Sequence, residues 1–225
     1  SAGEPLPSDL LARWQGTFGV DILDGLGTTE MLHIFVSNRP DEITPGSTGR
    51  VVPGYQIRLI NDNNEVCAPG EMGVLEVSGP SSALMYWGQR QKTKDTFRGS
   101  WTRTGDNYSI SEKGVMTYGG RNDDMLKVGG IYVSPFEVEA ALIKHEAVLE
   151  AAVVGNNDQD GLVKPKGFIV LNKNFPGSDE LASELINFVK TNLAEYKYPR
   201  WIEFLDELPK TATGKIQRFK LRTAS

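Results

Sequence analysis

The sequence predicts a β-rich segment followed by a compact α+β domain. Between Gly46 and Arg121, short apolar runs alternate with turns rich in glycine and asparagine, a pattern typical of strands joined by tight connections. After Arg121 the pattern changes to capped amphipathic helices that alternate with apolar runs. These two observations predict a domain boundary near Asp123, which divides the chain into residues 1–122 and 123–225.

The first domain is predicted to hold one helix and several strands. Ser8 precedes an apolar-periodic stretch, which predicts a helix over residues 8–16 with Ser8 as its N-cap. The apolar stripe of this helix would be Leu10, Leu11 and Trp14. Strands are expected at residues 20–23, 55–60, 73–78 and 114–118.

The second domain has clearer helix signals. Ser134, Pro135 and Glu137 are an N-cap, a first-turn proline and a capping-box acid, so a helix is expected from there to about Lys144. Ser178 is predicted to cap a longer helix. The apolar face of that helix would be Leu181, Leu185, Phe188 and Val189. Strands are expected at 148–155, 167–171 and 201–205, and a helical tail is expected from Ile216.

Composition limits the classes of protein to which the chain can belong. Its 225 residues are 39% hydrophobic and 24% charged, which is typical of a globular protein. The formal net charge of −5 gives no attraction to nucleic acid or to an anionic membrane, and no apolar run has the length of a membrane span. The single cysteine, Cys67, excludes an intrachain disulfide and favours a reducing, cytoplasmic location.

The loop at residues 24–30 combines backbone flexibility with oxygen donors and acceptors. Its two glycines let a ligand approach the backbone closely. The hydroxyls of Thr28 and Thr29 can donate to a phosphate, and Glu30 can hold Mg²⁺. The alternative is a polar, glycine-rich turn without a ligand.

Two further polar groups could hold a ribose. Asp106 is expected at a tight turn, where its carboxylate can accept two hydrogen bonds from a diol, although it could also form an Asx-turn with Asn107. Arg121 could donate to ribose or phosphate oxygens, or form only a surface salt bridge.

The second domain contains two candidate binding features, a glycine pair and a lysine on a loop. Gly129 and Gly130 leave a place without side chains, and the run at residues 122–124 suits a hinge. Lys215 ends the loop at residues 208–215, where it could bind a phosphate or be one exposed lysine among many. This loop is not a P-loop, because proline replaces the first glycine.

In this order and spacing the motifs resemble the adenylate-forming superfamily, which includes acyl-CoA synthetases, peptide-synthetase adenylation domains and beetle luciferases. The resemblance extends from Ser1 to about Arg222, and residues 73–79 and 86–88 look like another of its core motifs. Residues 24–38 look most like benzoate–CoA ligases. The fold implied is the C-terminal part of such an enzyme. It comprises the end of the large N-terminal domain, with a helix, strands and a small β-barrel subdomain, and then a small α+β lid domain.

The resemblance also implies a role for each matched residue. Lys215, Thr29 and Glu30 would be catalytic, and Glu30 would also hold Mg²⁺. ATP or AMP would contact Gly3, Glu4, Pro5, Asp24, Gly25, Leu26, Asp106, Tyr118 and Arg121. Coenzyme A would contact Gly129, Gly130, Tyr196 and Arg200. The acid pocket, a mostly apolar slot with one polar corner, would include Gly27, His33 and Ile34, and Asp123 would be the hinge.

The implied activity is that of an acid–CoA ligase. It would use ATP and Mg²⁺ to activate a benzoate-type aromatic acid as the acyl-adenylate, and would then pass the acyl group to coenzyme A. The family's Ser/Thr/Gly-rich phosphate loop lies upstream and is absent from this sequence, so we expect this polypeptide alone to be inactive. Another aryl or medium-chain acyl-CoA synthetase, and a non-catalytic nucleotide- or CoA-binding module, remain open alternatives. Further partners suggested by the resemblance are a second copy of the chain and a protein acyltransferase acting on Lys215.

Overall fold

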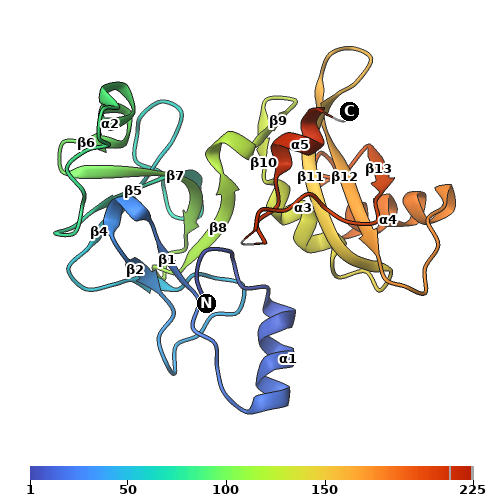
Figure 1. Cartoon of the computed structure of the whole chain (residues 1–225), viewed down its shortest axis with the longest axis horizontal. Coiled ribbons are helices and arrows are strands. Elements are labelled where there is room, and N and C mark those ends of the chain that lie inside the picture. The colour runs from blue at the N-terminus through green and yellow to red at the C-terminus, as the bar shows by residue number, and fades with distance from the viewer. Residues whose placement is uncertain (213, 224–225) are drawn as a thin grey trace. The chain divides into compact units, whose positions relative to one another are not determined.

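The computed structural model describes residues 1–212 and 214–223. The chain divides into two compact units, Ser1–Asn122 and Asp123–Ser225. Each unit has its own hydrophobic core and its own set of helices and strands (Figure 1).

The first unit is built on antiparallel sheets. A five-stranded sheet has the order β4 (Gln56–Ile60), β5 (Met72–Ser78), β7 (Trp101–Ile110) and β6 (Phe97–Arg98), with β8 (Met116–Arg121) also paired to β7. A three-stranded sheet consists of β1 (Gly25–Gly27), β2 (Ile34–Ser37) and β3 (Arg50–Val51). The helical elements are α1 (Ser8–Phe18), η1 (Thr29–Met31) and α2 (Arg90–Thr96). The core between them includes the fully buried Met31, Phe35, Leu75, Val77 and Met116.

The strand predictions for this unit are partly confirmed. Strand β5 covers its expected residues, β4 begins one residue later than expected, and the strand expected at residues 114–118 begins two residues later, as β8. The strand expected at residues 20–23 is wrong: Val20 is exposed, and pairing with β2 begins only at Gly25. The longest strand of the unit, β7, occupies residues that we expected to form a turn around Asp106.

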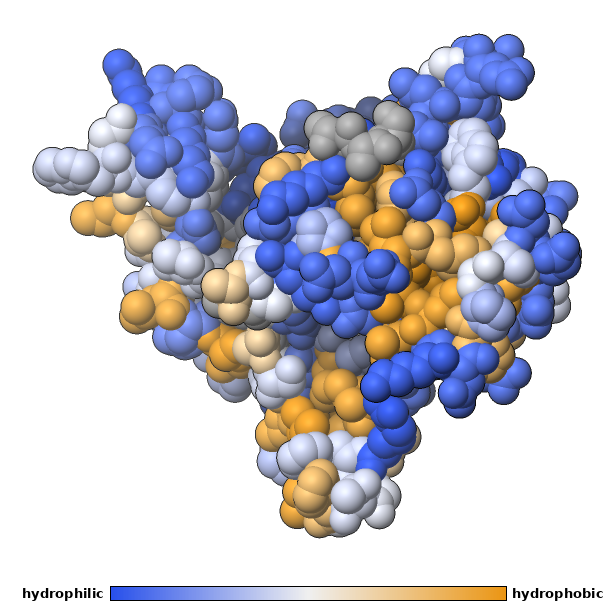
Figure 2. All heavy atoms as spheres, turned by 45° about the vertical axis from the view of Figure 1, so that its right-hand side comes forward, coloured by the Kyte–Doolittle hydropathy of each residue, from blue (hydrophilic) through white to orange (hydrophobic). Residues whose placement is uncertain are grey.

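Helix α1 is confirmed, but its first residue and its buried face differ from the prediction. The N-cap is Pro7, whose carbonyl accepts the first helical hydrogen bond from the Leu11 N–H, so Ser8 already lies inside the helix. Only Leu11 of the predicted stripe is buried, whereas Leu10 and Trp14 are exposed. Figure 2 shows apolar atoms on the surface of this helix.

The second unit has a three-stranded sheet covered on both faces. Strand β12 (Val163–Leu171) lies between the antiparallel β11 (Val148–Asn157) and the parallel β13 (Trp201–Phe204). Val153 and Ile169 pack with helices α3 (Pro135–Leu142) and α4 (Asp179–Asn192), while Ala152 and Phe168 pack with Leu221 of α5 (Arg218–Thr223). Successive residues of a strand point to opposite faces of the sheet, so Val153 and Ile169 face one layer of helices while Ala152 and Phe168 face the other. Because both faces are covered, these strands are apolar at nearly every position.

The predictions for the second unit are largely confirmed. The hydroxyl of Ser134 accepts a hydrogen bond from the Glu137 N–H, and that of Ser178 accepts one from the Leu181 N–H, so both caps form as expected. The Glu137 carboxylate binds the Lys197 ammonium at 2.6 Å. The expected strands and the helical tail are present as β11, β12, β13 and α5.

Two short elements precede α3. The 3₁₀ turn η2 (Asn122–Asp124) leads into a hairpin of β9 (Leu126–Val128) and β10 (Ile131–Val133). Within the residues that the structure describes, no helix is long and apolar enough to cross a membrane.

Candidate active site

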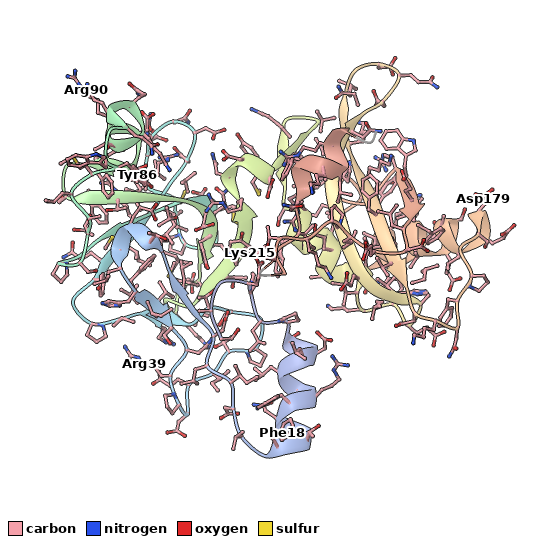
Figure 3. All side chains as sticks on the ribbon, in the orientation of Figure 1. Phe18, Arg39, Tyr86, Arg90, Asp179 and Lys215 are labelled. Carbon is pink, nitrogen blue, oxygen red and sulfur yellow. The ribbon has the colours of Figure 1, made fainter. Side chains whose placement is uncertain are left out.

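The turn that carries Glu30 is fixed by its own cap and by a distant loop. The Thr28 hydroxyl accepts a hydrogen bond from the Met31 N–H at 3.3 Å. The Ala83 N–H donates to the Glu30 carbonyl at 2.8 Å, and the Tyr86 hydroxyl donates to the Glu30 carboxylate. Figure 3 labels Tyr86 before α2. Tyr86 belongs to the motif at residues 86–88, but the sequence predicts no role for it, since nothing in the local pattern indicates a partner 56 residues away.

The surroundings of Glu30 favour its charged form. Partial burial raises the pKa of this carboxyl group, but the hydrogen bonds from Tyr86, its own backbone and Thr28, together with the charge of Lys92, lower the pKa below its ordinary value. The Lys92 ammonium lies 4.0 Å from the centre of the Tyr86 ring. Thr29 is exposed beside Glu30.

Tyr86→Phe should destabilise the first unit by about 1 kcal/mol at neutral pH, because it removes a donor to a charged, partly exposed acceptor. A carboxyl group with a lowered native pKa contributes stability above its unfolded pKa and loses it as the pH falls through the native pKa. The difference between wild type and variant should therefore shrink on acidification. Urea unfolding at several pH values measures it, and a difference independent of pH would contradict the assigned role.

The residues expected to border adenine lie together. The Gly25 N–H donates to the Ser1 carbonyl at 3.0 Å, Ala2 forms a parallel bridge with Gly25, and the Leu6 N–H donates to the Asp24 carboxylate, so residues 3–5 are joined on both sides to Asp24 and Gly25. Asp24 is 4% exposed, and its Oδ1 atom has no hydrogen-bond partner within the described structure. Burial raises the pKa of Asp24, and the hydrogen bond from the Leu6 N–H lowers it in part. Because buried acceptors are nearly always hydrogen-bonded, the Asp24 Oδ1 atom suits a ligand that donates a hydrogen bond to it.

The two expected ribose contacts are neighbours on adjacent strands. Asp106 of β7 and Arg121 of β8 are register partners, and the Arg121 Nη1 atom lies 3.0 Å from the Asp106 carboxylate. Asp106 therefore lies inside a strand and not at the tight turn that we expected. Gly105 has a φ of +78°, and a Cβ there would lie 3.3 Å from the Arg121 guanidinium, which explains the glycine at this position. Tyr118 lies on β8, its ring 5.4 Å from that of Tyr108.

The three expected acid-pocket residues also lie together. Gly27 pairs with Ile34 across β1 and β2. A Cβ on Gly27 would lie 2.6 Å from the His33 carbonyl oxygen, so no larger residue fits without movement of the backbone. His33 itself is exposed and hydrogen-bonded to Tyr55 at 3.1 Å.

In the second unit, Gly129 and Gly130 form the two-residue turn between β9 and β10. Their φ angles are +57° and +86°, as the tight turn of this hairpin requires. Both are exposed, and a Cβ on either would have no neighbour within 4 Å. The turn is therefore a bare stretch of backbone, as expected. Asp123 lies in η2, at the first position of the second unit.

Lys215 is exposed on a short loop that is closed by backbone hydrogen bonds (Figure 3). Lys210 and Ile216 form a β-bridge, and the Thr211 N–H donates to the Lys215 carbonyl at 2.8 Å. The Lys215 N–H donates in turn to the Thr211 hydroxyl at 3.1 Å. Thr213, which belongs to the same predicted loop, lies outside the described residues.

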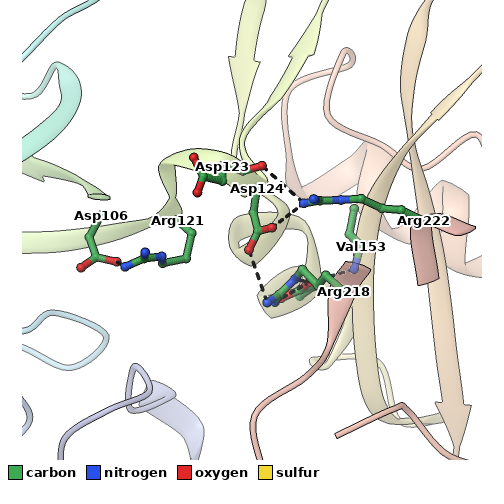
Figure 4. A network of polar contacts seen from close by, with 8 residues as sticks. Asp106, Arg121, Asp123, Asp124, Val153, Arg218 and Arg222 are labelled. Carbon is green, nitrogen blue, oxygen red and sulfur yellow. Dashed lines mark hydrogen bonds and ion pairs between the residues drawn. The ribbon is translucent and has the colours of Figure 1, made fainter. Parts of the chain in front are cut away.

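An ionic network around the buried Glu139 was not anticipated from the sequence (Figure 4). The Glu139 carboxylate of α3 accepts hydrogen bonds from the Val153 N–H at 2.7 Å and from the Arg218 guanidinium at 2.7 Å. Arg218 also lies 3.9 Å from Asp124, to which Arg222 is bound as well. Burial raises the pKa of Glu139, and the charge of Arg218 opposes that shift. The network joins α5, and hence the end of the Lys215 loop, to η2 and α3.

The other two expected contacts to coenzyme A, Tyr196 and Arg200, lie after α4. The Arg200 guanidinium stacks over the Tyr198 ring at 3.5 Å, and its buried Nη1 atom has no hydrogen-bond partner within the described residues. Desolvation lowers the pKa of Arg200. Tyr196 is half-buried against the core of the unit.

A magnesium site here would depend on the substrate. Among the described residues, no group of three or more His, Cys, Asp or Glu side chains could hold a metal ion. Mg²⁺ is commonly bound by one or two carboxylates together with substrate phosphates and water. The charged carboxylate of Glu30 fits that donor set.

The chain belongs to the family of AMP-binding enzymes: the AMP-binding enzyme model matches residues 1–87, and the model of the AMP-binding enzyme C-terminal domain matches residues 137–215. The predicted fold class, the C-terminal part of an adenylate-forming enzyme, is thereby confirmed.

Among its relatives, the chain is 61% identical over 225 residues to the benzoate–CoA ligase of Thauera aromatica. It is 52% identical over 225 residues to the 4-hydroxybenzoate–CoA/benzoate–CoA ligase of Rhodopseudomonas palustris. These alignments cover 100% and 99% of the chain but only 43% and 41% of the two relatives. The crystal structure of the anthranilate CoA ligase AuaEII with anthranoyl-AMP matches with a TM-score of 0.94 and 50% identity, covering 100% of this chain and 43% of that one.

Proposed function

We propose that the chain is the C-terminal part of an ATP-dependent, AMP-forming acid–CoA ligase that acts on a benzoate-type aromatic acid. The observation that carries this proposal is the 61% identity to a benzoate–CoA ligase along the whole chain. A carboxylate would attack the α-phosphorus of ATP and release pyrophosphate. The thiol of coenzyme A would then attack the acyl carbon and release AMP.

The first unit would bind the nucleotide. Asp106 and Arg121 present a carboxylate and a guanidinium 3.0 Å apart, which suits a ribose diol, with Tyr118 on the same strand as Arg121. Residues 3–5 and Asp24–Leu26 would border the adenine. There the Asp24 Oδ1 atom can accept a hydrogen bond from the nucleotide. Thr29, exposed beside Glu30, would donate to the α-phosphate.

Glu30 would hold Mg²⁺ together with phosphate oxygens of the nucleotide. When bound, the ion would offset negative charge on those oxygens. The chain's own contribution is to keep the carboxylate ionised and fixed in direction, which the Tyr86 hydroxyl and the Thr28-capped turn accomplish.

The second unit would supply groups for both half-reactions. Lys215 would offset charge on the phosphoryl group during adenylation, as one preorganised cation. The bare turn of Gly129 and Gly130 would border the thiol-bearing arm of coenzyme A, and Arg200 and Tyr196 would contact its nucleotide. Because the two steps need different groups of this unit, we infer that Asp123 is the pivot between them, in the manner of other hinge motions.

The acid would lie against Gly27, His33 and Ile34. The absence of a side chain at Gly27 and the apolar Ile34 favour a flat ring over a bulky group. Another aryl acid or a medium-chain acid is the alternative within this class. In the full-length enzyme we expect benzoate to be activated with a kcat/KM at least about tenfold above that for hexanoate, since a flat pocket discriminates at the level of a few methylenes.

Two measurements test the proposal. The full-length enzyme should catalyse benzoate-dependent ATP–pyrophosphate exchange and form benzoyl-CoA, and the 225-residue chain alone should do neither. Isothermal titration of the chain with AMP and with coenzyme A addresses the non-catalytic alternative. A full-length protein that binds both nucleotides but activates no acid in a panel of benzoates and alkanoates would overturn the enzymatic proposal.

Partners and location are further proposals. The acid, ATP and coenzyme A would be the small-molecule partners. A second copy of the chain and an acyltransferase that modifies the exposed Lys215 would be protein partners, and the location would be the cytoplasm.

A further inference from the structure

A chain of hydrogen bonds in the first unit joins His33 to the loop after β5. The His33 Nδ1 atom lies 2.7 Å from the Ile34 carbonyl, and its Nε2 atom lies 3.1 Å from the Tyr55 hydroxyl. The Tyr55 hydroxyl lies 2.7 Å from that of Ser81, which donates to the Met31 carbonyl at 2.7 Å. Four contacts thus connect two backbone carbonyls through three side chains, called here the His33–Tyr55–Ser81 chain.

The two ends of this chain fix the direction of its protons. A carbonyl oxygen can only accept, so Nδ1 of His33 must carry a proton and Ser81 must donate to Met31. The neutral imidazole is therefore held as the Nδ1–H tautomer, with the acceptor Nε2 turned to Tyr55.

A count of protons shows when Nε2 is engaged. With a neutral imidazole the three side chains supply three protons for four contacts, and Tyr55 donates either to Nε2 or to Ser81. With a second proton on the imidazole, Nε2 donates to Tyr55, Tyr55 donates to Ser81, and every contact has one proton. Neither ring nitrogen of His33 is left to bind a ligand when Tyr55 donates to Nε2 or when Nε2 carries the second proton, whereas Nε2 keeps a lone pair for a ligand when Tyr55 donates to Ser81.

We propose that Tyr55 is a specificity-determining positioning residue. Its hydroxyl donates a hydrogen bond to Nε2 of His33, so that the acid contacts the C–H edge of the imidazole and finds no free hydrogen-bonding nitrogen. This proposal rests on the proposed function, in which His33 borders the acid. The polar corner expected of this pocket is then already satisfied within the protein. Such a pocket gives no hydrogen bond to a ring hydroxyl and so favours an unsubstituted ring over a hydroxylated one.

The tautomer can be tested without any catalytic assay, because the chain has only two histidines. In His145 the arrangement is reversed: Nδ1 accepts from the Ala147 N–H at 3.3 Å, and Nε2 lies 3.2 Å from the Glu184 carboxylate. ¹⁵N–¹H correlation spectra of the chain at about pH 9, where imidazoles are neutral, should show Nδ1–H for His33 and Nε2–H for His145. His145→Gln assigns the signals. An Nε2–H tautomer at His33 would overturn the proposal.

The specificity is tested in the full-length enzyme with benzoate and the three hydroxybenzoates. Tyr55→Phe keeps the ring but frees Nε2 for the substrate. It should raise kcat/KM for at least one hydroxybenzoate relative to benzoate by about fivefold, the effect of one hydrogen bond. Ser81→Ala is the matched control: it leaves Nε2 as the acceptor for the Tyr55 proton and should keep the wild-type ratio.

Each outcome separates the proposal from its alternatives. If Tyr55→Phe lowers kcat/KM for all four acids equally, Tyr55 is merely structural and the proposal is wrong. If no hydroxybenzoate gains, Nε2 does not face the acid, and the proposal is equally wrong. If the wild type activates no aromatic acid at all while the tautomers are as expected, the proposed function fails but the hydrogen-bond chain stands.

Discussion

Lys215→Ala should reduce acid-dependent ATP–pyrophosphate exchange by the full-length enzyme about 100-fold or more. The expectation follows from the loss of one preorganised charge that acts on the developing transition state. The loop around Lys215 is closed by the Lys210–Ile216 bridge and by two hydrogen bonds between Thr211 and Lys215, so truncation of the side chain leaves its backbone intact. Thioester formation from supplied benzoyl-adenylate should stay within about threefold of the wild type.

The test of this role is the difference between the two half-reactions in Lys215→Ala: exchange should be lost and thioester formation kept. Lys210→Ala removes a lysine from the same segment, whose ammonium lies 2.5 Å from Glu150, and should change exchange by less than about threefold, since exposed ion pairs contribute little. An equal loss in both half-reactions of Lys215→Ala would indicate misfolding and would contradict the assigned role.

Local sequence signals predicted the elements whose ends are built from neighbouring residues. The caps of Ser134 and Ser178 each require only a donor three residues away, so α3 and α4 were predicted correctly. Strand β7 was missed because its polar residues indicated a turn. In the fold these residues find partners on other strands: the Arg103 guanidinium binds the buried Glu76, and the Thr104 hydroxyl donates to the Leu75 carbonyl.

The candidate site divides in the same way. Gly27, His33 and Ile34 are close in sequence, and their proximity could be predicted from the short connection between two strands. Tyr55 and Tyr86 could not, because the contacts that they make span 22 and 56 residues and depend on how the sheets pack. A residue that only positions another side chain, as Tyr86 positions Glu30, carries no sequence signal for that role. Any side chain that places a hydrogen-bond donor at the same point could do the same.

Glu139→Ala should destabilise the second unit by about 3–5 kcal/mol, the range for removal of one partner of a buried ion pair. Glu139 is 4% exposed and receives both the Val153 N–H and the Arg218 guanidinium. The variant removes the buried carboxylate that pairs with Arg218. It also removes the acceptor of the Val153 N–H, which lies in the apolar core of the unit. Glu203→Ala is the control, because it removes a carboxylate that is 43% exposed from its pair with Lys166 on the same sheet and should cost less than about 1 kcal/mol.

Amide hydrogen exchange resolves this effect within the second unit. Exchange of the β11 amides should become at least about 100-fold faster in Glu139→Ala, since each 1.4 kcal/mol corresponds to a factor of ten. The β5 amides belong to the first unit and should exchange at the wild-type rate. Joint replacement of Glu139 by leucine and Arg218 by methionine should recover most of the loss, because an apolar pair removes the charge that has lost its buried partner. If the double variant is as unstable as Glu139→Ala, packing at this position and not charge pairing stabilises the junction of α3, α5 and η2.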